Sequence, residues 1–282
     1  MALTPATIPA LLARHGLRPS RALGQNFLAD PNTARRIARL AQVQSGDRVL
    51  EIGPGIGSLT VALLEAGAVV TALELDEHVI PALEETVGTD AVRIVRGDAL
   101  RVDVAELLSA DDARDDGRPW CMVSNLPYNV ATPIVMRLLE SVPEIGSLLV
   151  MVQREVGERM AAGPGTKAYG AVSVKIAYYG HARVVGTVSP SVFIPAPKVD
   201  SALVRIVRHA EPPVAVPSED RLFALVRAGF GQRRKMLRGA LRAELGDDVE
   251  HFLESANIDG RVRAETLTLE QWAALARVVP GL

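Results

Sequence analysis

The chain has 282 residues, of which 48% are hydrophobic and 23% are charged, so it is neither disordered nor fibrous and can bury a large core. Its formal net charge is only -2, which excludes a generally basic surface and leaves a local patch as the source of any nucleic-acid contact. No apolar run approaches the roughly 20 residues of a membrane-spanning helix. The N-terminus lacks the pattern of a signal peptide. Its arginines are compatible with a transit peptide, but it has a single serine, Ser20, and leads directly into a motif, so we expect it to be part of the mature protein.

Strand-like and helix-like patterns alternate through the first 150 residues. Short apolar runs predict strands at 47–52, 68–75, 91–97, 120–124 and 147–152, and helical spacing predicts helices at 57–67, 76–88 and 132–140. Gly67 is expected just after the first of these helices, and Pro81 is compatible with the second only in its first turns. This alternation predicts a Rossmann-like α/β fold, a parallel sheet with helices on both faces.

The pattern changes after about residue 180. Two further strands are expected at 182–188 and 201–208, joined by a Pro-rich segment, as an antiparallel addition at the sheet edge. The Pro-rich stretch 209–220 is the expected linker. Helical patterns at 221–245 and 268–279 then predict a small all-helical domain. We therefore expect a catalytic domain at 1–208 and a C-terminal domain at 209–282.

The single cysteine and the five histidines carry no evident chemistry. Cys121 lies in an apolar strand, and one cysteine cannot form an internal disulfide, so we expect a reducing, cytoplasmic environment. The histidines lie away from the motifs below. We expect no bound metal, no membrane association and a monomeric protein.

Three successive strands end in residues typical of an adenosine-binding site. The first runs into a turn that contains Gly53, Gly55 and Gly57, the second ends at Glu74, and the third ends at Asp98. Ligands of open α/β sheets bind at the carboxyl ends of the strands, where glycines allow close approach and an acid can accept from ribose hydroxyls. Each feature also has a purely structural explanation: the glycines could form a tight strand-to-helix connection, and an acid could stabilise a turn.

The pattern of these residues favours S-adenosylmethionine over a nicotinamide cofactor. The dinucleotide fingerprint requires a glycine where Ser58 stands, whereas G-x-G-x-G preceded by Glu51 suits a methyl donor. Asp98 can then reach an adenine amine. Asp76 is more simply a helix cap than a ligand.

The fourth strand leads to Asn125, Leu126, Pro127 and Tyr128, which either form a plain strand-ending turn or act on an amine. An exocyclic adenine amine is a poor nucleophile because its lone pair is delocalised into the ring. The Asn125 side-chain oxygen and the Leu126 carbonyl can accept the amine hydrogens and free that lone pair. Pro127 stiffens the turn, and Tyr128 offers a face for stacking.

The chain resembles the ribosomal RNA adenine N6,N6-dimethyltransferases, in particular the branch that modifies the small ribosomal subunit. The resemblance covers nearly the whole length, and its motifs are specific as an ordered set. They are GQNFL (24–28), EIGPGIGSLT (51–60), ELD (74–76), GDAL (97–100), NLPYNVATP (125–133), QREVGERM (153–160), KAYGAVSV (167–174) and FIPAPKVDSALV (193–204).

The resemblance implies a class I methyltransferase sheet and a role for each motif residue. Tyr128 and Phe193 are implied to sandwich the target adenine, and Asn125 to lie beside the transferring methyl. The implied substrate is a pair of adjacent adenines in the 3′-terminal hairpin of 16S rRNA, each methylated twice on N6 within the small subunit. The implied S-adenosylmethionine contacts are Gln25, Asn26, Leu28, Gly53, Gly55, Gly57, Glu74, Leu75, Asp98, Ala99 and Asn125.

A basic stretch near the C-terminus is the expected RNA contact outside the pocket. It contains Arg233, Arg234, Lys235 and Arg238. On a continuous helix Arg234 and Lys235 would share a face with Arg238, although an ordinary solvated face gives the same pattern. The segment 34–39 is a weaker second candidate.

Three other functions remain open on the sequence. They are a large-subunit rRNA methyltransferase of the macrolide-resistance type, a non-catalytic assembly factor that retains the fold, and a DNA adenine methyltransferase. The motifs NLPYN, KAYG and PKVDSALV favour the small-subunit branch. The intact segment 125–128 argues against lost catalysis.

Overall fold

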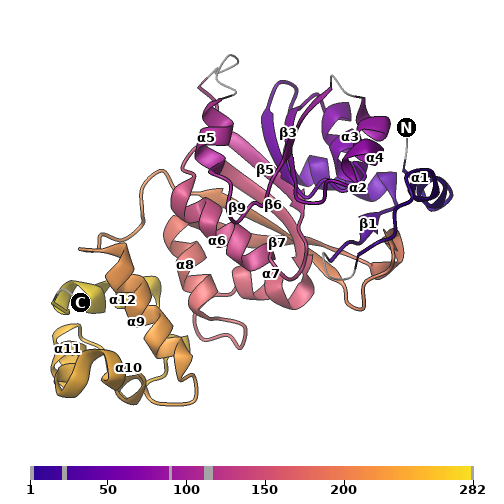
Figure 1. The fold of residues 1–282 in the computed structure, drawn as a ribbon. Coiled ribbons are helices and arrows are strands. Elements are labelled where there is room, and N and C mark those ends of the chain that lie inside the picture. Colours follow the sequence, from indigo (N-terminus) through magenta and orange to yellow (C-terminus); the bar gives the residue numbers. More distant parts are fainter. Residues whose placement is uncertain (1–2, 21–23, 89–90, 111–116, 281–282) are drawn as a thin grey trace. The chain divides into compact units, whose positions relative to one another are not determined.

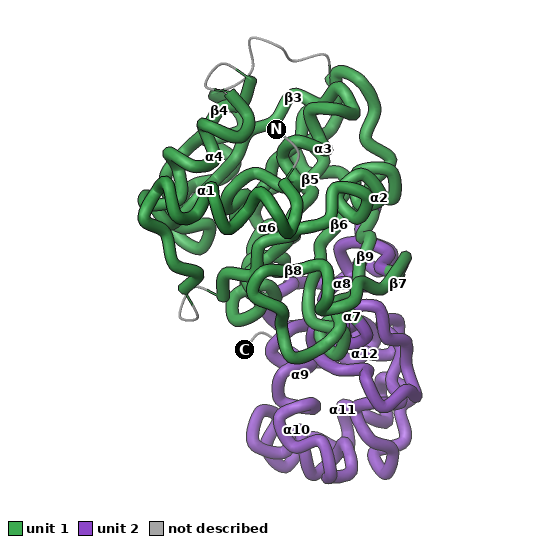
Figure 2. The backbone as a smooth tube through the Cα atoms, turned by 90° about the vertical axis from the view of Figure 1, so that its right-hand side faces the viewer, with its two compact units in different colours: residues 1–157, 183–208 green, residues 158–182, 209–282 purple. Residues whose placement is uncertain are grey.

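A computed structural model of the chain describes residues 3–20, 24–88, 91–110 and 117–280. Two compact units make up this structure (Figure 2). The first comprises Met1–Gly157 and Arg183–Arg208, and the second comprises Glu158–Ala182 and His209–Leu282. The second unit begins earlier than the linear division expected at residue 208, because Tyr169, Val174 and Tyr178 pack in the same apolar cluster as the C-terminal helices.

Within the described residues, seven strands form the main sheet, in the order β4-β3-β2-β5-β6-β9-β7 (Figure 1). The five strands β4 to β6 pair in parallel, and β9 pairs antiparallel with β6. The expected parallel sheet with an antiparallel addition is confirmed. In chain order the strands are β2 (Arg48–Ile52), β3 (Val69–Glu74), β4 (Val92–Arg96), β5 (Trp120–Asn125), β6 (Ile145–Gln153), β7 (Gly180–Val188) and β9 (Ser201–Arg208).

Helices flank both faces of this sheet (Figure 1). An apolar cluster joins α2 and α3 to β2, β5 and β6 through side chains such as Ile37, Leu63 and Leu149. Burial of such side chains contributes about 1.5–3 kcal/mol each to folding. The helices of this part are α1 (Ile8–Arg14), α2 (Pro31–Ala41), α3 (Ser58–Glu65), α4 (Ile80–Val87), α5 (Val104–Ser109), α6 (Ala131–Ser141) and α7 (Arg154–Met160).

The helix expected from Asp76 begins four residues later, as α4. The Asp76 side chain accepts a hydrogen bond from the backbone N–H of His78, so it stabilises the preceding turn instead of capping the helix itself. Pro81 lies in the first turn of α4, where a missing N–H costs little. Gly67 follows α3 with φ of +85°, the left-handed conformation expected after a helix end.

A small second sheet joins two distant motifs of the sequence. In the described part of the chain, β1 (Phe27–Leu28) pairs antiparallel with β8 (Phe193–Ile194), with Leu28 opposite Phe193. The sequence patterns do not predict this sheet, because each strand has only two residues. It attaches the N-terminal segment to the segment that precedes β9.

The second unit is helical around an apolar cluster centred on Trp272, which is fully buried. The backbone between residues 231 and 237 leaves the helical conformation, so one expected helix at 221–245 is two helices with a turn between them. The unit contains α8 (Ala171–Tyr179), α9 (Glu219–Gly231), α10 (Leu237–Leu245), α11 (Val249–Ser255) and α12 (Leu269–Val278), with short 3-10 turns at Gly246–Asp248 and Ala264–Thr266.

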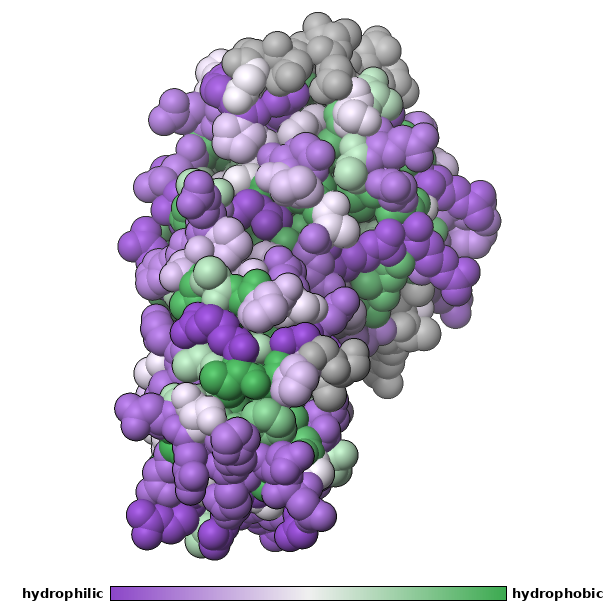
Figure 3. Space-filling view, turned by 90° about the vertical axis from the view of Figure 1, so that its left-hand side faces the viewer, coloured by the Kyte–Doolittle hydropathy of each residue, from purple (hydrophilic) through white to green (hydrophobic). Residues whose placement is uncertain are grey.

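Hydrophilic side chains cover most of the face in Figure 3, and hydrophobic residues on it form small separate patches. None of the helices in the described ranges has both the length and the apolar character that crossing a membrane requires. The apolar side chains instead lie inside each unit.

Candidate active site

An open cavity of about 200 Å³ lies at the carboxyl ends of β2, β3, β4 and β5. This is the edge at which open α/β sheets bind ligands. Of the residues predicted to bind the cofactor, ten border the cavity; the exception is Gly57. Its lining consists of residues 24–28, 51–56, 58, 59, 73–76, 97–100, 125–130 and 134.

The glycine turn after β2 forms one wall. Gly53 and Gly55 have φ of +70° and +57°, a conformation that favours glycine. A Cβ on Gly55 would lie 3.2 Å from the ring of Phe27, so the turn also needs glycine for the N-terminal segment to pack on it. The two glycines therefore allow the backbone of this turn to border the cavity.

Gly57 serves packing and does not border the cavity. It precedes α3 with φ of +92°, and a Cβ there would lie 2.9 Å from Leu83 Cδ1 and 3.1 Å from Val87 Cγ1 of α4. The third glycine of the motif therefore allows α3 and α4 to approach closely. Its predicted contact with the cofactor has no counterpart in the lining.

Gly57→Ala is expected to lower the free energy of unfolding by about 2–5 kcal/mol, because strain of about 1–2 kcal/mol adds to overpacking of about 1–3 kcal/mol. The control is Gly16→Ala, where φ is also positive, at +63°, but no atom lies within 4 Å of the new Cβ. Gly16→Ala should lower the free energy of unfolding only by the backbone strain, about 1–2 kcal/mol. Chemical denaturation of both variants measures the difference, and equal losses would contradict the packing role.

The acids at the strand ends are held by backbone amides. One carboxylate oxygen of Glu74 accepts from the N–H of Gly55 at 3.0 Å, and the other accepts from the N–H of Asp76 at 2.9 Å. Asp98 accepts from the N–H of Leu100 at 2.9 Å. These bonds fix both acids at the cavity edge and link Glu74 to the glycine turn, while Leu75 and Ala99 border the cavity beside them.

The cavity is strongly acidic. Among the described residues that border it, the Asp, Glu, Lys, Arg and His side chains are all acids: Glu51, which is mostly protonated at neutral pH, and Glu74, Asp76 and Asp98. Burial raises the pKa of Glu74, against the opposing backbone hydrogen bonds. Burial also raises the pKa of Glu51 to about 8, although the Thr60 hydroxyl lowers it, and the nearby Glu74 adds to the rise. Such a lining favours a cationic ligand and disfavours phosphates.

The N-terminal segment, residues 24–28, forms another part of the lining. Gln25 donates from Nε2 to Asp76 Oδ2 at 2.8 Å, and its Oε1 accepts from the N–H of Ser20. Asn26 and Leu28 border the same space, and Asn26 donates to the carbonyl of Gly24. All three residues lie where the sequence motif predicted them.

The segment 125–128 reaches the cavity from the end of β5. The side chain of Asn125 donates from Nδ2 to the carbonyl of Asn26 at 3.3 Å, which leaves its Oδ1 as an acceptor. Leu126 is buried and its N–H bonds to the carbonyl of Met151. The N–H of Val130 donates to the carbonyl of Pro127, so the motif forms a closed turn. The turn is therefore both a strand end and a polar wall of the cavity.

The two aromatic rings predicted to hold a base are placed differently. Tyr128 borders the cavity, and its hydroxyl shares a 2.7 Å hydrogen bond with the hydroxyl of Ser201. Phe193 is 3% exposed, lies in β8 opposite Leu28, and is not part of the lining. No sequence pattern indicates this burial, because an aromatic residue in a Pro-rich segment is compatible with either environment.

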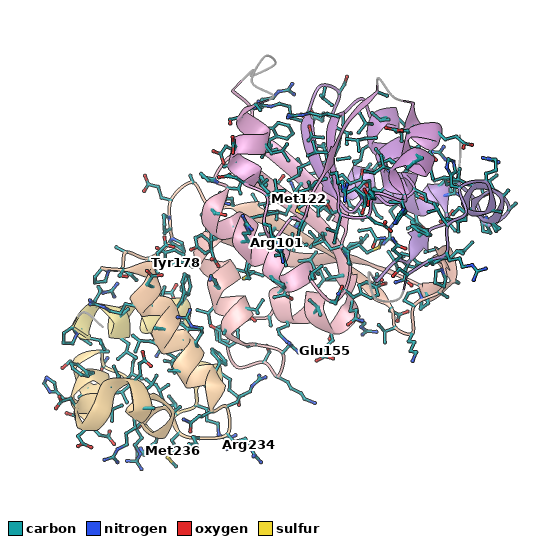
Figure 4. The ribbon with its side chains drawn as sticks, in the orientation of Figure 1. Arg101, Met122, Glu155, Tyr178, Arg234 and Met236 are labelled. Atoms are coloured by element: carbon teal, nitrogen blue, oxygen red, sulfur yellow. The ribbon has the colours of Figure 1, made fainter. Side chains whose placement is uncertain are left out.

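The predicted RNA-contact residues lie in the second unit but not on one helix face. Arg234 and Lys235 occupy the turn between α9 and α10, and Figure 4 shows Arg234 and Met236 projecting outward there. Arg233 donates to the carbonyls of Lys167 and Tyr169, and Arg238 pairs with Glu250 at 3.3 Å. Arg233 and Arg238 therefore have structural partners, while Arg234 and Lys235 are exposed on the turn.

Family comparison gives a consistent result. A model of the family described as ribosomal RNA adenine dimethylase matches residues 17–279. The chain is 47% identical to the ribosomal RNA small subunit methyltransferase A of Thermobifida fusca, over 99% of this chain and 96% of that one. It is 48% identical to the protein of the same name from Leifsonia xyli subsp. xyli, with 97% of each chain covered.

Two solved structures share the fold. The crystal structure of the 23S rRNA methyltransferase ErmE superposes with a TM-score of 0.67 and 27% identity, covering 91% of this chain and all of that one. A dimethyladenosine transferase from Plasmodium falciparum superposes with a TM-score of 0.70 and 23% identity, covering 88% and 95%. The Rossmann-like class I methyltransferase sheet expected from the sequence is thus confirmed.

Proposed function

The chain belongs to the ribosomal RNA adenine dimethylase family, and from this premise we propose that it dimethylates the N6 amines of two adjacent adenines in the 3′-terminal hairpin loop of 16S rRNA. The relatives named as small subunit methyltransferases, which are 47% and 48% identical, support the small subunit as the site of action. The protein is thus an rRNA adenine dimethyltransferase. The proposal adds its substrate position, its methyl donor and the roles of its residues.

The charge of the cavity supports S-adenosylmethionine as the methyl donor. This molecule carries a positive sulfonium and no phosphate. It therefore suits a lining with four acidic side chains, of which only Glu51 is mostly protonated by its pKa of about 8, and with no Lys, Arg or His among the described residues. A dinucleotide would place its phosphates against these acids. The charges of the lining side chains therefore fit S-adenosylmethionine better than a nicotinamide cofactor.

Individual residues can be assigned to parts of this cofactor. Glu74 would accept from the ribose hydroxyls with the lone pairs that Gly55 and Asp76 leave free. Asp98 would accept from the adenine amine, with Leu75 and Ala99 beside the ring. Gln25, Asn26 and Leu28 would cover the cofactor from the N-terminal side, and Gly53 would lie under its methionine end. When bound, the cofactor supplies an electrophilic methyl group.

The chain's own contribution to catalysis is to activate the amine. Asn125 Oδ1 and the carbonyl of Leu126 would accept the two amine hydrogens and draw the nitrogen toward tetrahedral geometry. The bond from Asn125 Nδ2 to Asn26 fixes the amide so that its oxygen, and not its nitrogen, is the group available. No side-chain base is required, because the methylated ammonium readily loses a proton to water.

Tyr128 would provide the stacking surface for the base. Taking a base out of its stack costs a few kcal/mol, and stacking on an aromatic side chain returns about 1–3 kcal/mol. A loop adenine is therefore the favoured substrate. A second contact from Phe193 would require β8 to move, since that ring is buried against Leu28.

The observation that carries the proposal is the free Asn125 acceptor at the edge of an acidic cavity. Its test is incubation with radiolabelled S-adenosylmethionine and small subunits that lack the hairpin methyl groups, followed by mapping of the label. We expect dimethyladenine at two adjacent positions near the 3′ end of 16S rRNA. Label only on 23S rRNA would indicate the macrolide-resistance type of activity. Binding of the subunit without any label would indicate an assembly factor.

We also propose that the turn between α9 and α10 contacts RNA phosphates. The double variant Arg234→Glu/Lys235→Glu is expected to weaken subunit binding. The fall of the logarithm of the binding constant with the logarithm of the salt concentration should become less steep, by about 1–2 in slope, because two phosphate contacts are lost. The control, Arg118→Glu/Arg261→Glu, changes the net charge equally at side chains that pair with Asp47 and Asp259. An identical salt slope for both double variants would refute this contact.

A further inference from the structure

Tyr128 has a dedicated hydrogen-bond partner on a different strand. Its hydroxyl lies 2.7 Å from the hydroxyl of Ser201, and either oxygen can donate. Tyr128 is also one of the residues that border the cavity. Burial raises the pKa of the Tyr128 hydroxyl, against the opposing hydrogen bond to Ser201, so the bonded group is a neutral phenol at physiological pH.

Ser201 is held rigidly. It is the first residue of β9, is fully buried, and lies opposite Gln153 in the antiparallel pair with β6. The first residue of α7 is bonded beside the same point, since the N–H of Arg154 donates to the carbonyl of Asp200 at 2.9 Å. A hydroxyl fixed to the sheet at this point can hold the tip of a ring from the neighbouring loop.

The position of this ring matters because stacking requires its face to lie beside the base. Rotation about the Cα–Cβ bond swings the ring tip and moves the whole ring, and a hydrogen bond at the tip restricts this rotation. Of the two rings expected to contact the base, only Tyr128 borders the cavity in the described structure. Its position therefore determines the available stacking surface.

We propose that Ser201 is a positioning residue for methyl transfer, which holds the Tyr128 ring at the place where the target adenine stacks on it. The inference rests on the proposed function of Tyr128 as a stacking surface. It assigns a role to the hydroxyl of Ser201 that is distinct from packing, because a buried alanine at this position would fill nearly the same space. Without the bond, the phenol loses its partner and the ring tip can swing to other positions.

The test is a double-mutant cycle with Ser201→Ala and Tyr128→Phe. Each single variant is expected to lower kcat about three- to tenfold, the effect of one neutral hydrogen bond, and the double variant is expected to be no slower than either. Ser201→Thr, which keeps the hydroxyl, should restore most of the rate. The control is Ser191→Ala, which removes an exposed hydroxyl. If Ser201→Ala lowered kcat by the same factor in Tyr128→Phe as in the wild type, the two side chains would act independently and the proposal would be overturned.

A second measurement does not depend on activity. In protein labelled with ¹³C-tyrosine, the signals of the Tyr128 ring are identified by their loss in Tyr128→Phe. They are expected to shift in Ser201→Ala, with the other tyrosine signals unchanged. Unaltered Tyr128 signals would refute the positioning role even if activity falls. If the wild-type enzyme transferred no methyl groups to rRNA, the proposed function would fail while a shift of these signals still supported the bond.

Discussion

Replacing Asn125 with alanine is expected to lower the rate of methyl transfer about 10²–10³-fold, by analogy with the loss of one preorganised polar group at a reacting centre. The amine nitrogen must become nucleophilic, and Asn125 Oδ1 is the side-chain acceptor at the cavity edge that the bond to Asn26 leaves free. Single-turnover kinetics at saturating S-adenosylmethionine and small subunits measure this step. The affinity for S-adenosylmethionine should change far less than the rate.

The control for this prediction is Asn32→Ala, which removes an asparagine side chain at the start of α2, outside the cavity. It should leave the rate unchanged. Near-normal turnover of Asn125→Ala would show that the Leu126 carbonyl alone activates the amine, and the proposed role of the side chain would have to be abandoned. A loss of cofactor binding equal to the loss of rate would make Asn125 a binding residue.

The site at the sheet edge was predictable because its residues follow from strand periodicity. Each β strand of the parallel sheet is a short apolar run, and the residue after the run lies at the carboxyl edge. This position alone predicts Glu74, Asp98 and Asn125 at the edge, and all three border the cavity there. The glycine turn directly follows the first strand, and the left-handed backbone at Gly53 and Gly55 is one that favours glycine.

The remaining features depend on contacts between distant residues. Gly57 belongs to the same motif as Gly53, but the side chain of Leu83 decides that its role is packing. Phe193 is buried because a two-residue strand pairs it with Leu28, and such a strand has no sequence pattern. Ser201 was likewise part of a recognised motif without a visible partner. Its hydroxyl acquires a role only when β9 is placed beside the loop that carries Tyr128.

The interruption between α9 and α10 shows the limit of helical periodicity. The stretch 221–245 has helical spacing throughout, and its apolar positions continue on both sides of the break. Arg233 leaves the helical pattern to donate to two carbonyls of the segment 167–169, which is remote in sequence. The expected shared face of Arg234, Lys235 and Arg238 is therefore wrong, and the exposed cations lie on a turn.

Glu51→Gln is expected to remove a large pH dependence of stability. Glu51 is 1% exposed, one of its carboxylate oxygens has no hydrogen-bond partner among the described residues, and its pKa in the folded state is about 8 against an ordinary value of 4.5. A raised pKa means that the folded state holds the proton more tightly than the unfolded chain. The stability from this proton is complete below about pH 4.5 and is lost as the pH rises through about 8.

The wild-type protein should therefore lose stability relative to Glu51→Gln across this window, by at most ~5 kcal/mol, since one pKa unit corresponds to about 1.36 kcal/mol. Glutamine keeps the shape of the protonated acid and cannot ionise, so the two proteins should be similar at pH 5 and the variant should be more stable at pH 9. Denaturant unfolding without cofactor at pH 5, 7 and 9 measures the gap, and Glu244→Gln on the exposed surface of α10 is the control. A difference in the free energy of unfolding that stays constant with pH would show that Glu51 ionises normally in the folded protein. Its carboxylate and that of Glu74 would then place two negative charges beside the cavity in the absence of any ligand.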